Sequence, residues 1–422
     1  MDILSVSIIA GGLLFYSIVS GKLQGTIVTA PLVFVVFGFV VGGGGFRIVE
    51  IAMGHEVIHF IAELTLILVL FTDAARIDLR QVRRDHNLPV RMLLIGLPLA
   101  IGFGALAATQ LFPGFSIWEA VLLATLLAPT DAALGQAVVS ARIVPVRIRQ
   151  AINVESGLND GIALPAVLLF AAFASGSAAT DGAGEWLRFG MLQVTLGPLV
   201  GAAVGLVGAR LLDRAVDHDW VGESYRGVGV ISLAVLTFVL AELVGGNGFI
   251  AAFIGGMVFG NSIRHPCTAL FEFMETEGQL LMLITFFFFG ATLLPEGLAH
   301  LSAVHFVYAG LSLTLIRIIP IAISLVGSGL RLPSVLFLGW FGPRGLASIL
   351  FALLIVEEAQ IALIDELLSV TFITVALSVL LHGVTAAPLA RRFGERAARM
   401  GSCEENEVVG ELPLRAGRMP GK

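Results

Sequence analysis

Apolar runs near the roughly 20 residues that span a bilayer recur along most of this chain, and they restrict its fold more than any other feature. Hydrophobic residues make up 57% of the 422 residues and charged residues only 13%. A soluble protein of this size does not need so much apolar surface. The sequence therefore predicts an all-α polytopic membrane protein whose surroundings are membrane lipid.

We expect about thirteen transmembrane helices. Their ranges are 3–20, 26–44, 56–72, 88–112, 116–140, 150–175, 188–212, 225–244, 246–262, 276–294, 299–327, 335–356 and 365–389. The eighth and ninth are separated only by the glycine-rich tight turn at 245–248. The first run begins at Ile3 with no basic segment before it, so we expect a retained helix and not a cleaved signal peptide.

Arginines in the connecting loops predict the orientation, because such residues collect on the cytoplasmic side. With thirteen spans, one side of the membrane receives Arg76, Arg80, Arg83, Arg84, Arg142, Arg147, Arg149, Arg214, Arg264, Arg331, Arg391, Arg392, Arg396 and Arg399. Arg47 and Arg188 are exceptions. We expect an integral, multi-pass plasma (inner) membrane protein with its N-terminus outside, its C-terminus cytoplasmic and a disordered tail.

The sixth span contains two carboxylates, Glu155 and Asp160, together with Ser156 and Asn159. A charge at the centre of a membrane helix costs about 2.5–3.5 kcal/mol on insertion scales, so these residues are expected to have a function. On a helix, Ser156 and Asp160 share one face, and Glu155 and Asn159 share the neighbouring face. One face offers oxygen atoms to an ion, and the other offers a carboxylate that needs a cationic partner.

Two further spans contain a proline beside a charge at mid-membrane: Ala-Pro-Thr-Asp at 128–131 in the fifth, and Gly-Pro-Arg-Gly at 342–345 in the twelfth. Proline breaks the helical hydrogen-bond pattern, and irregular backbone at this depth normally lines a cavity. Since the two spans run in opposite directions, they predict an inverted repeat with two broken crossing helices, in which spans one to six correspond to spans eight to thirteen. Asp131 would neutralise helix N-termini and Arg344 helix C-termini. Asp131 also has a ligand interpretation, and a simple kink remains the alternative to a break.

Two more charged residues in or near the spans need an oppositely charged or polar partner. Arg317 is the only charge in the eleventh span, and its expected partner is Glu155, which leaves Asp160 as the unpaired carboxylate. Asp73 closes the third span. It either faces the cytoplasmic mouth of a cavity or pairs with Arg76 at the interface.

Together these motifs resemble the electroneutral sodium/proton antiporters of the Asn-Asp type. They form part of the monovalent cation/proton antiporter family and are prokaryotic relatives of the animal sodium/proton exchangers. The resemblance rests on residues 155–160, preceded by 128–131 and followed by 342–345, and it extends to 248–253 and 286–290. Several ordered motifs at the family's spacing make it specific.

The resemblance implies an ion site and its support. The site would consist of Asp160, Asp131, Ser156, the carbonyl of Thr130 and an acid from the third span, here Asp73. Asn159 and a Glu155–Arg317 pair would brace it, with Arg344 as a further support. The third-span acid is often Glu in the family. The shorter Asp73 leaves open whether it contacts the ion directly or through water.

A homodimer is also implied, in which each protomer has a dimerisation domain and a six-helix ion-translocating core. We assign 1–87 and 225–298 to the dimerisation domain, and 88–175 and 299–390 to the core. Residues 176–224 would form a linking helix with loops, and residues 391–422 a short cytoplasmic tail.

The predicted function is secondary active antiport of a monovalent cation, Na+ or Li+, against H+. A carboxylate must be ionised to bind a cation, so Asp160 would hold either a proton or a cation, with electroneutral 1:1 exchange by alternating access. A K+/H+ antiporter is the alternative, followed by a sodium-coupled organic-anion symporter or a cation channel. The sequence shows no nucleophile–base set and no metal cluster, and its two cysteines, Cys267 and Cys403, are far apart. We therefore expect no enzyme activity, no cofactor other than the transported ions, and no nucleic-acid partner.

Overall fold

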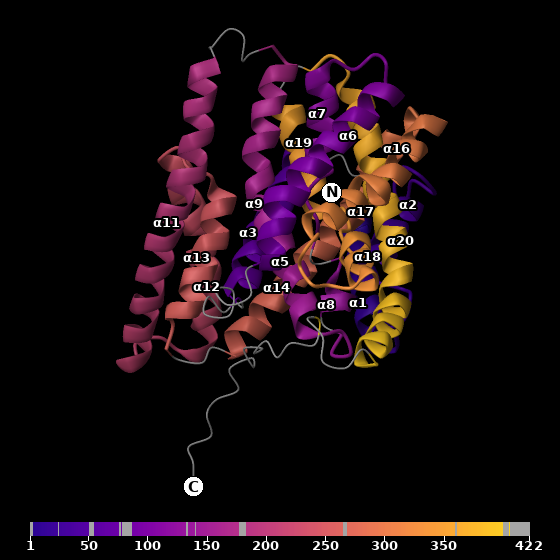
Figure 1. Ribbon diagram of the computed structural model, residues 1–422. Coiled ribbons are helices and arrows are strands. Elements are labelled where there is room, and N and C mark those ends of the chain that lie inside the picture. The colour runs from indigo at the N-terminus through magenta and orange to yellow at the C-terminus, as the bar shows by residue number, and fades with distance from the viewer. Residues whose placement is uncertain are drawn as a thin grey trace.

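The computed structural model describes residues 3–23, 25–49, 55–75, 77, 87–131, 134–139, 141–176, 183–264, 268–358, 361–399 and 405. Within these residues the regular structure is helical throughout (Figure 1). Nine helices of this part are long and apolar enough to cross a membrane, and four shorter apolar helices accompany them. Each expected span contains one of them, which confirms the predicted architecture. Outside the described residues lie Arg76, Arg80, Arg83, Arg84, Cys267 and Cys403.

The helices follow the expected order of spans. Spans one to six comprise α1 (Ile3–Leu23), α2 (Ala30–Val41), α3 (His55–Ala75), α5 (Asn87–Arg91), η1 (Met92–Gly96), α6 (Leu97–Leu111), α7 (Ile117–Leu126), α8 (Gln136–Val139) and α9 (Val146–Ala174). Spans seven to ten comprise α11 (Ala183–Asp217), α12 (Glu223–Leu243), α13 (Gly248–Ser262), α14 (Thr268–Phe288), η2 (Phe289–Leu293) and α15 (Leu294–Ala299). The remainder comprises α16 (Ala303–Leu313), α17 (Leu315–Ser324), α18 (Leu332–Trp340), α19 (Leu346–Glu358) and α20 (Ile364–Ala398).

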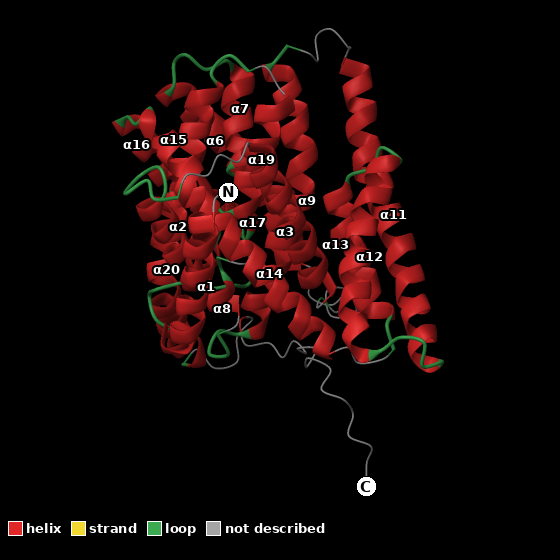
Figure 2. Cartoon of the chain, turned by 180° about the vertical axis from the view of Figure 1, so that it is seen from behind, coloured by secondary structure: helices red, strands yellow, loops and turns green. Residues whose placement is uncertain are grey.

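Viewed from either side, α11, α12 and α13 lie at one edge of the molecule and α16 and α20 at the other (Figures 1 and 2). Helix α13 packs against α11, α3 and α12, and α2 packs against α14 and η2. On the other side, α6 and α9 pack against α7, and α17 packs against α18. Helices α3 and α9 lie between the two edges, so the polar stretch of α9 is enclosed by protein.

Glycines allow the helices around α13 to approach closely. A Cβ atom at Gly205 of α11 would collide with the carbonyl of Gly255 on α13. One at Gly260 of α13 would collide with the carbonyl of Ala75 on α3. Association of membrane helices depends on such close packing, because lipid tails are as apolar as the helix surfaces. The glycines therefore fix α13 between its neighbours.

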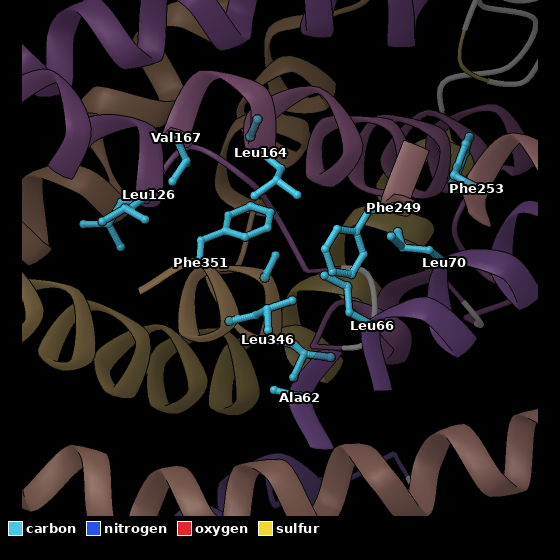
Figure 3. Close-up of a cluster of buried hydrophobic side chains, with 14 of the residues drawn as sticks. Ala62, Leu66, Leu70, Leu126, Leu164, Val167, Phe249, Phe253, Leu346 and Phe351 are labelled. Carbon is cyan, nitrogen blue, oxygen red and sulfur yellow. The ribbon is translucent and has the colours of Figure 1, made fainter. Parts of the chain in front are cut away.

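An apolar cluster joins the two sides of the molecule. Figure 3 shows Phe249 of α13 facing Leu66 of α3, and Phe351 of α19 lying near Leu126 of α7 and Leu164 of α9. These side chains belong to one buried cluster. The broken fifth and twelfth spans thus pack on the same apolar layer as α3 and α13.

Two π-helical segments interrupt spans four and ten. Segment η1 precedes the Leu-Pro that begins α6, and η2 precedes the Leu-Pro that begins α15. A proline ring crowds the carbonyl one turn before it. The wider π turn leaves more room for the ring in both segments.

Span eleven differs from the prediction of one continuous helix over 299–327. It is divided at Thr314, whose φ of −120° and ψ of −94° are not helical. Thr314 is neither glycine nor proline, so the local sequence contains no signal for the break. The division puts Arg317 in the first turn of α17.

The C-terminal region is more structured than expected. Helix α20 extends to Ala398, past the boundary at 390, and Gly394 packs closely on the carbonyl of Ile143. In the tail that was expected to be disordered, Glu405 is fully buried. Its carboxylate accepts hydrogen bonds from the N–H of Arg331 and the hydroxyl of Ser334, each at 2.8 Å, and so caps the start of α18.

Candidate functional site

Helix α9 carries the polar stretch through the interior. Glu155 and Asn159 are fully buried, Ser156 is 2% exposed and Asp160 is 6% exposed. Burial of a polar group without partners costs about 1–3 kcal/mol by mutational measures, so the partners of these four side chains decide what the site can do.

The broken fifth span lies against α9. Helix α7 ends at Leu126, before Pro129. Pro129 has no N–H to offer the carbonyl of Thr125, which instead accepts the N–H of Ala128 at 3.3 Å in a tighter turn. The carbonyl of Leu126 accepts the hydroxyl of Ser348 from α19 at 2.8 Å. The free carbonyls at this helix end are therefore satisfied by local and tertiary bonds.

Thr130, directly after the proline, is held by two side chains of α9. The hydroxyl of Ser156 donates to the carbonyl of Thr130. The N–H of Thr130 donates to Oδ1 of Asn159 at 3.3 Å, and Nδ2 of Asn159 donates to the Thr130 hydroxyl at 2.7 Å. Ser156 and Asn159 thus replace the helical hydrogen bonds that the break removes.

The predicted ion pair between Glu155 and Arg317 is confirmed. Nη1 and Nη2 of Arg317 donate to Oε1 and Oε2 of Glu155 at 2.8 and 2.9 Å, and neither side chain is more than 1% exposed. Nδ2 of Asn159 lies 3.3 Å from Oε1, and the Thr130 hydroxyl lies 3.3 Å from Oε2. This bidentate pair therefore holds the break in place as well as neutralising two charges.

Asp131 connects the two breaks. Its N–H donates to the carbonyl of Pro343 at 2.8 Å. Its Oδ2 accepts the N–H of Leu346, at the start of α19, at 2.7 Å, and its Oδ1 accepts the N–H of Leu134 at 3.3 Å. Its predicted place at positive helix ends is confirmed.

Arg344 makes the reciprocal contact. Its Nη1 donates to the carbonyls of Ala128 and Pro129, at 2.9 and 3.2 Å, just beyond the C-terminal end of α7. This side chain is 1% exposed. Each break therefore supplies the charge that the helix end of the other requires, as the sequence predicted for Asp131 and Arg344.

Two glycines make the crossing possible. A Cβ atom at Gly345 would collide with the carboxylate of Asp131, and one at Gly342 would collide with the guanidinium of Arg317. A larger residue at Gly345 would displace Asp131 from the start of α19, and one at Gly342 would displace Arg317 from Glu155. The glycines are thus required for close approach and not for an unusual φ.

Asp160 is the exception in this network. Its Oδ1 is buried and has no hydrogen-bond partner among the described residues. The carboxylates of Asp131, Glu155 and Asp73 lie close enough to act on it electrostatically. Asp73 lies at the C-terminal end of α3 and is partly buried. An incompletely coordinated buried carboxylate among other carboxylates suits a proton or a small cation.

The chain matches the family described as sodium/hydrogen exchanger, transmembrane, over residues 8–392. It belongs to the sodium/hydrogen exchanger family. The matched region of this chain contains α9, both breaks and Arg317, so the site described above lies entirely within the family's transmembrane region.

Named relatives and a solved structure agree with this membership. The K(+)/H(+) antiporter NhaP of Alkalimonas amylolytica is 22% identical over 93% of this chain and 67% of its own length. The Na(+)/H(+) antiporter NhaP of Pseudomonas aeruginosa is 26% identical over 77% of this chain and 79% of its own. The structure of the sodium proton antiporter MjNhaP1 from Methanocaldococcus jannaschii is similar with a TM-score of 0.77 and 18% identity, covering 92% of this chain and 98% of that one. This likeness confirms the predicted antiporter fold.

Several residues that organise the site in this exchanger were not singled out from the sequence. Ser348 caps α7, and Ser378 and His382 of α20 hydrogen-bond to the second break. The available signal was a small polar or ionisable residue in an apolar span, since such side chains need partners in lipid. That signal does not reveal the partner when the partner is backbone.

Proposed function

We propose that this chain is a secondary active antiporter that exchanges a monovalent cation, Na+ in the first instance, for H+ by alternating access. The observation that carries the proposal is a buried oxygen of Asp160 that has no hydrogen-bond partner in the described part of the chain, beside a network in which Glu155, Asp131 and Arg344 are all bound. A proton or a cation completes that carboxylate, and the two compete for it. Such competition couples inward movement of one ion to outward movement of the other.

The proposed cation ligands are Asp160, Asp131, the carbonyl of Thr130 and Ser156, with Asp73 in contact directly or through water. Hard cations prefer carboxylate, carbonyl and hydroxyl oxygens. Asp131 accepts an N–H at each carboxylate oxygen, and a carboxylate oxygen that accepts one N–H can also ligate an ion through its second lone pair. Asn159, the Glu155–Arg317 pair and Arg344 would hold these ligands in position without titrating.

K+ is the second candidate cation. Relatives of similar identity are named K(+)/H(+) and Na(+)/H(+) antiporters. Oxygen ligands alone do not separate the two ions, so the identity of the cation is a question for transport assays.

We further propose a homodimer in the plasma membrane, with the N-terminus outside and the C-terminus cytoplasmic. In support of this orientation, α8 and the end of α20 lie at the same end of the molecule (Figure 1), where arginines of the corresponding loops collect. Residues 1–87 and 225–298 would form the dimerisation domain, and 88–175 with 299–390 the moving core. Residues 176–224 would link the two parts.

Purified protein in proteoliposomes, supplied in turn with Na+, Li+ and K+, tests the function. We expect proton flux that saturates with Na+ and is abolished by Asp160→Asn, because an amide neither takes up nor releases a proton. Asp365→Asn, an exposed carboxylate at the start of α20, is the matched control and should keep wild-type flux. Substantial cation-driven flux in Asp160→Asn, in a correctly folded sample, would overturn the assignment.

A further inference from the structure

Helix α20 binds the second break through two side chains that have no place in the proposed ion site. The hydroxyl of Ser378 accepts the N–H of Arg344 at 2.6 Å. Nε2 of His382 lies 2.9 Å from the carbonyl of Trp340, the last residue of α18, and Nδ1 lies 3.2 Å from the Ser378 hydroxyl. Ser378 is fully buried and His382 is 1% exposed.

The acceptors and donors around His382 determine how its ring is used. The carbonyl of Trp340 can only accept, so Nε2 carries the proton and donates to it. In a neutral ring Nδ1 then accepts the hydroxyl proton of Ser378, whose oxygen in turn accepts the N–H of Arg344. Nδ1 also lies 3.0 Å from the carbonyl of Ser378, a contact that becomes a hydrogen bond only when Nδ1 carries a proton, in the other neutral tautomer or in a charged ring. The neutral ring therefore connects both sides of the break in one chain.

This arrangement corresponds to the one at the first break. There, Ser156 of α9 binds the backbone carbonyl of Thr130, the residue directly after a proline. Here, Ser378 of α20 binds the backbone N–H of Arg344, again the residue directly after a proline. Spans six and thirteen correspond in the predicted inverted repeat, and each uses a serine to hold the neighbouring broken span.

The correspondence extends to the next helical turn. Asp160 follows its serine by four residues, and His382 follows its serine by four residues. Residues at this spacing share a helix face. Among the described residues, one oxygen of Asp160 has no hydrogen-bond partner, whereas both ring nitrogens of His382 have partners. At this position α9 thus carries a carboxylate that can still bind a proton or a cation, whereas α20 carries a histidine whose ring nitrogens are both hydrogen-bonded.

We propose that Ser378 and His382 are positioning residues for the cation site, an inference that rests on the proposed antiport function. They fix the backbone between α18 and α19. That backbone supplies the N–H of Leu346 to Asp131 and carries Arg344 to the carbonyls of Ala128 and Pro129. Loosening it displaces Asp131 and the adjacent carbonyl of Thr130, which are proposed ligands, while leaving Asp160 untouched.

The test is His382→Phe, which keeps a ring of similar volume and removes both hydrogen bonds. We expect the KM for Na+ in proteoliposomes to rise about tenfold, the order of effect expected from losing both buried hydrogen bonds, with the maximal rate within about twofold of wild type. The Na+ concentration that half-saturates the rise in melting temperature in detergent should increase by a similar factor. This second readout reports binding without transport.

His382→Gln provides the rescue. Its terminal amide can donate to the carbonyl of Trp340 as Nε2 does, so the KM should return to within about threefold of wild type. Ser378→Ala should also raise the KM for Na+. The Ser378→Ala/His382→Phe double variant should have a KM no higher than that of the single variant with the higher KM, because the two side chains form one hydrogen-bonded chain.

Thr385→Val is the matched control. Thr385 also joins α20 to Trp340, but through the indole Nε1 at 3.1 Å and not through the backbone at the break. It should leave the KM unchanged. If wild type exchanges and binds Na+ while His382→Phe matches it, or if His382→Phe and Thr385→Val raise the KM equally, the positioning role is overturned. If wild type shows neither Na+ binding nor exchange of any cation tested, the proposed function fails and this inference with it.

Discussion

At the scale of single residues, the two carboxylates of α9 differ in their partners and not in their burial. Glu155 is held by both terminal nitrogens of Arg317 and by Asn159, whereas one oxygen of Asp160 has no partner in the part of the chain that the structure describes. A paired charge stabilises the fold only while both members remain, and an unpaired carboxylate can change its state. We base on this difference the proposal that Glu155 braces the site and Asp160 binds the transported ion.

The pair makes a testable prediction about stability. Glu155→Ala or Arg317→Ala should each lower the melting temperature in detergent markedly, since an unpaired buried charge costs about 3–5 kcal/mol. The double variant should recover part of that loss. Strictly additive losses in a double-mutant cycle would show that the two side chains do not stabilise each other.

This pair could be predicted because Arg317 is the only charge in its span and needs a counter-charge. Asp131 and Arg344 could likewise be assigned to helix ends from their place beside the prolines. The bonds made by Asn159, Ser348 and Ser378 to backbone could not. Every residue offers a carbonyl and most offer an N–H, so the sequence holds no complementary partner to search for.

At the scale of the elements, the two broken spans form one unit. The N–H of Asp131 binds the carbonyl of Pro343, and the charged side chains of each break bind the helix end of the other. Separate prolines explain why each helix breaks. Only the glycines at 342 and 345 explain why the breaks can meet.

Gly345→Ala tests this unit. The added methyl group meets the carboxylate of Asp131, which is itself held by two N–H groups and cannot withdraw without losing one. We expect a clear fall in melting temperature and a raised KM for Na+. Gly310→Ala on α16 is the control, because a Cβ there has nothing within 4 Å. Its better helix propensity, worth about 1 kcal/mol, should leave stability equal or higher. Equal melting curves for the two variants would contradict the close crossing.

The breaks marked by proline were predictable, and the break at Thr314 was not. Its cause is tertiary, since it puts Arg317 in the first turn of α17 and opposite Glu155. A cation in a first helical turn is disfavoured by about 0.3–1 kcal/mol, and the bidentate pair offsets that cost. Hydropathy does not register such a break, because the chain remains apolar on both sides of it.

At the scale of the whole molecule, the number and order of the spans could be predicted because lipid leaves few alternatives to closed helices. Their packing could not. It depends on which glycine faces which carbonyl, as Gly205 and Gly260 do around α13, and many glycines are candidates. The contacts within the apolar layer that joins α13 to the broken spans could not be predicted from the sequence for the same reason (Figure 3).

Charge balance gives the last prediction, which concerns the whole transport cycle. With Asp131 held by helix ends and Glu155 by Arg317, Asp160 is the only carboxylate expected to change its state. One proton leaves as one monovalent cation arrives, so the loaded core has the same charge in either form. A membrane potential acts with about 2.3 kcal/mol per elementary charge per 100 mV, and here it has no net charge to move.

Clamping the potential with valinomycin and potassium should leave a sodium-driven proton flux unchanged, after a control showing that potassium is not itself exchanged. Competition for the ionised form further implies that apparent cation affinity falls about tenfold per pH unit once Asp160 is mainly protonated. A clear acceleration of flux under an imposed potential would mean that Asp131, Asp73 or Glu155 also exchanges a proton.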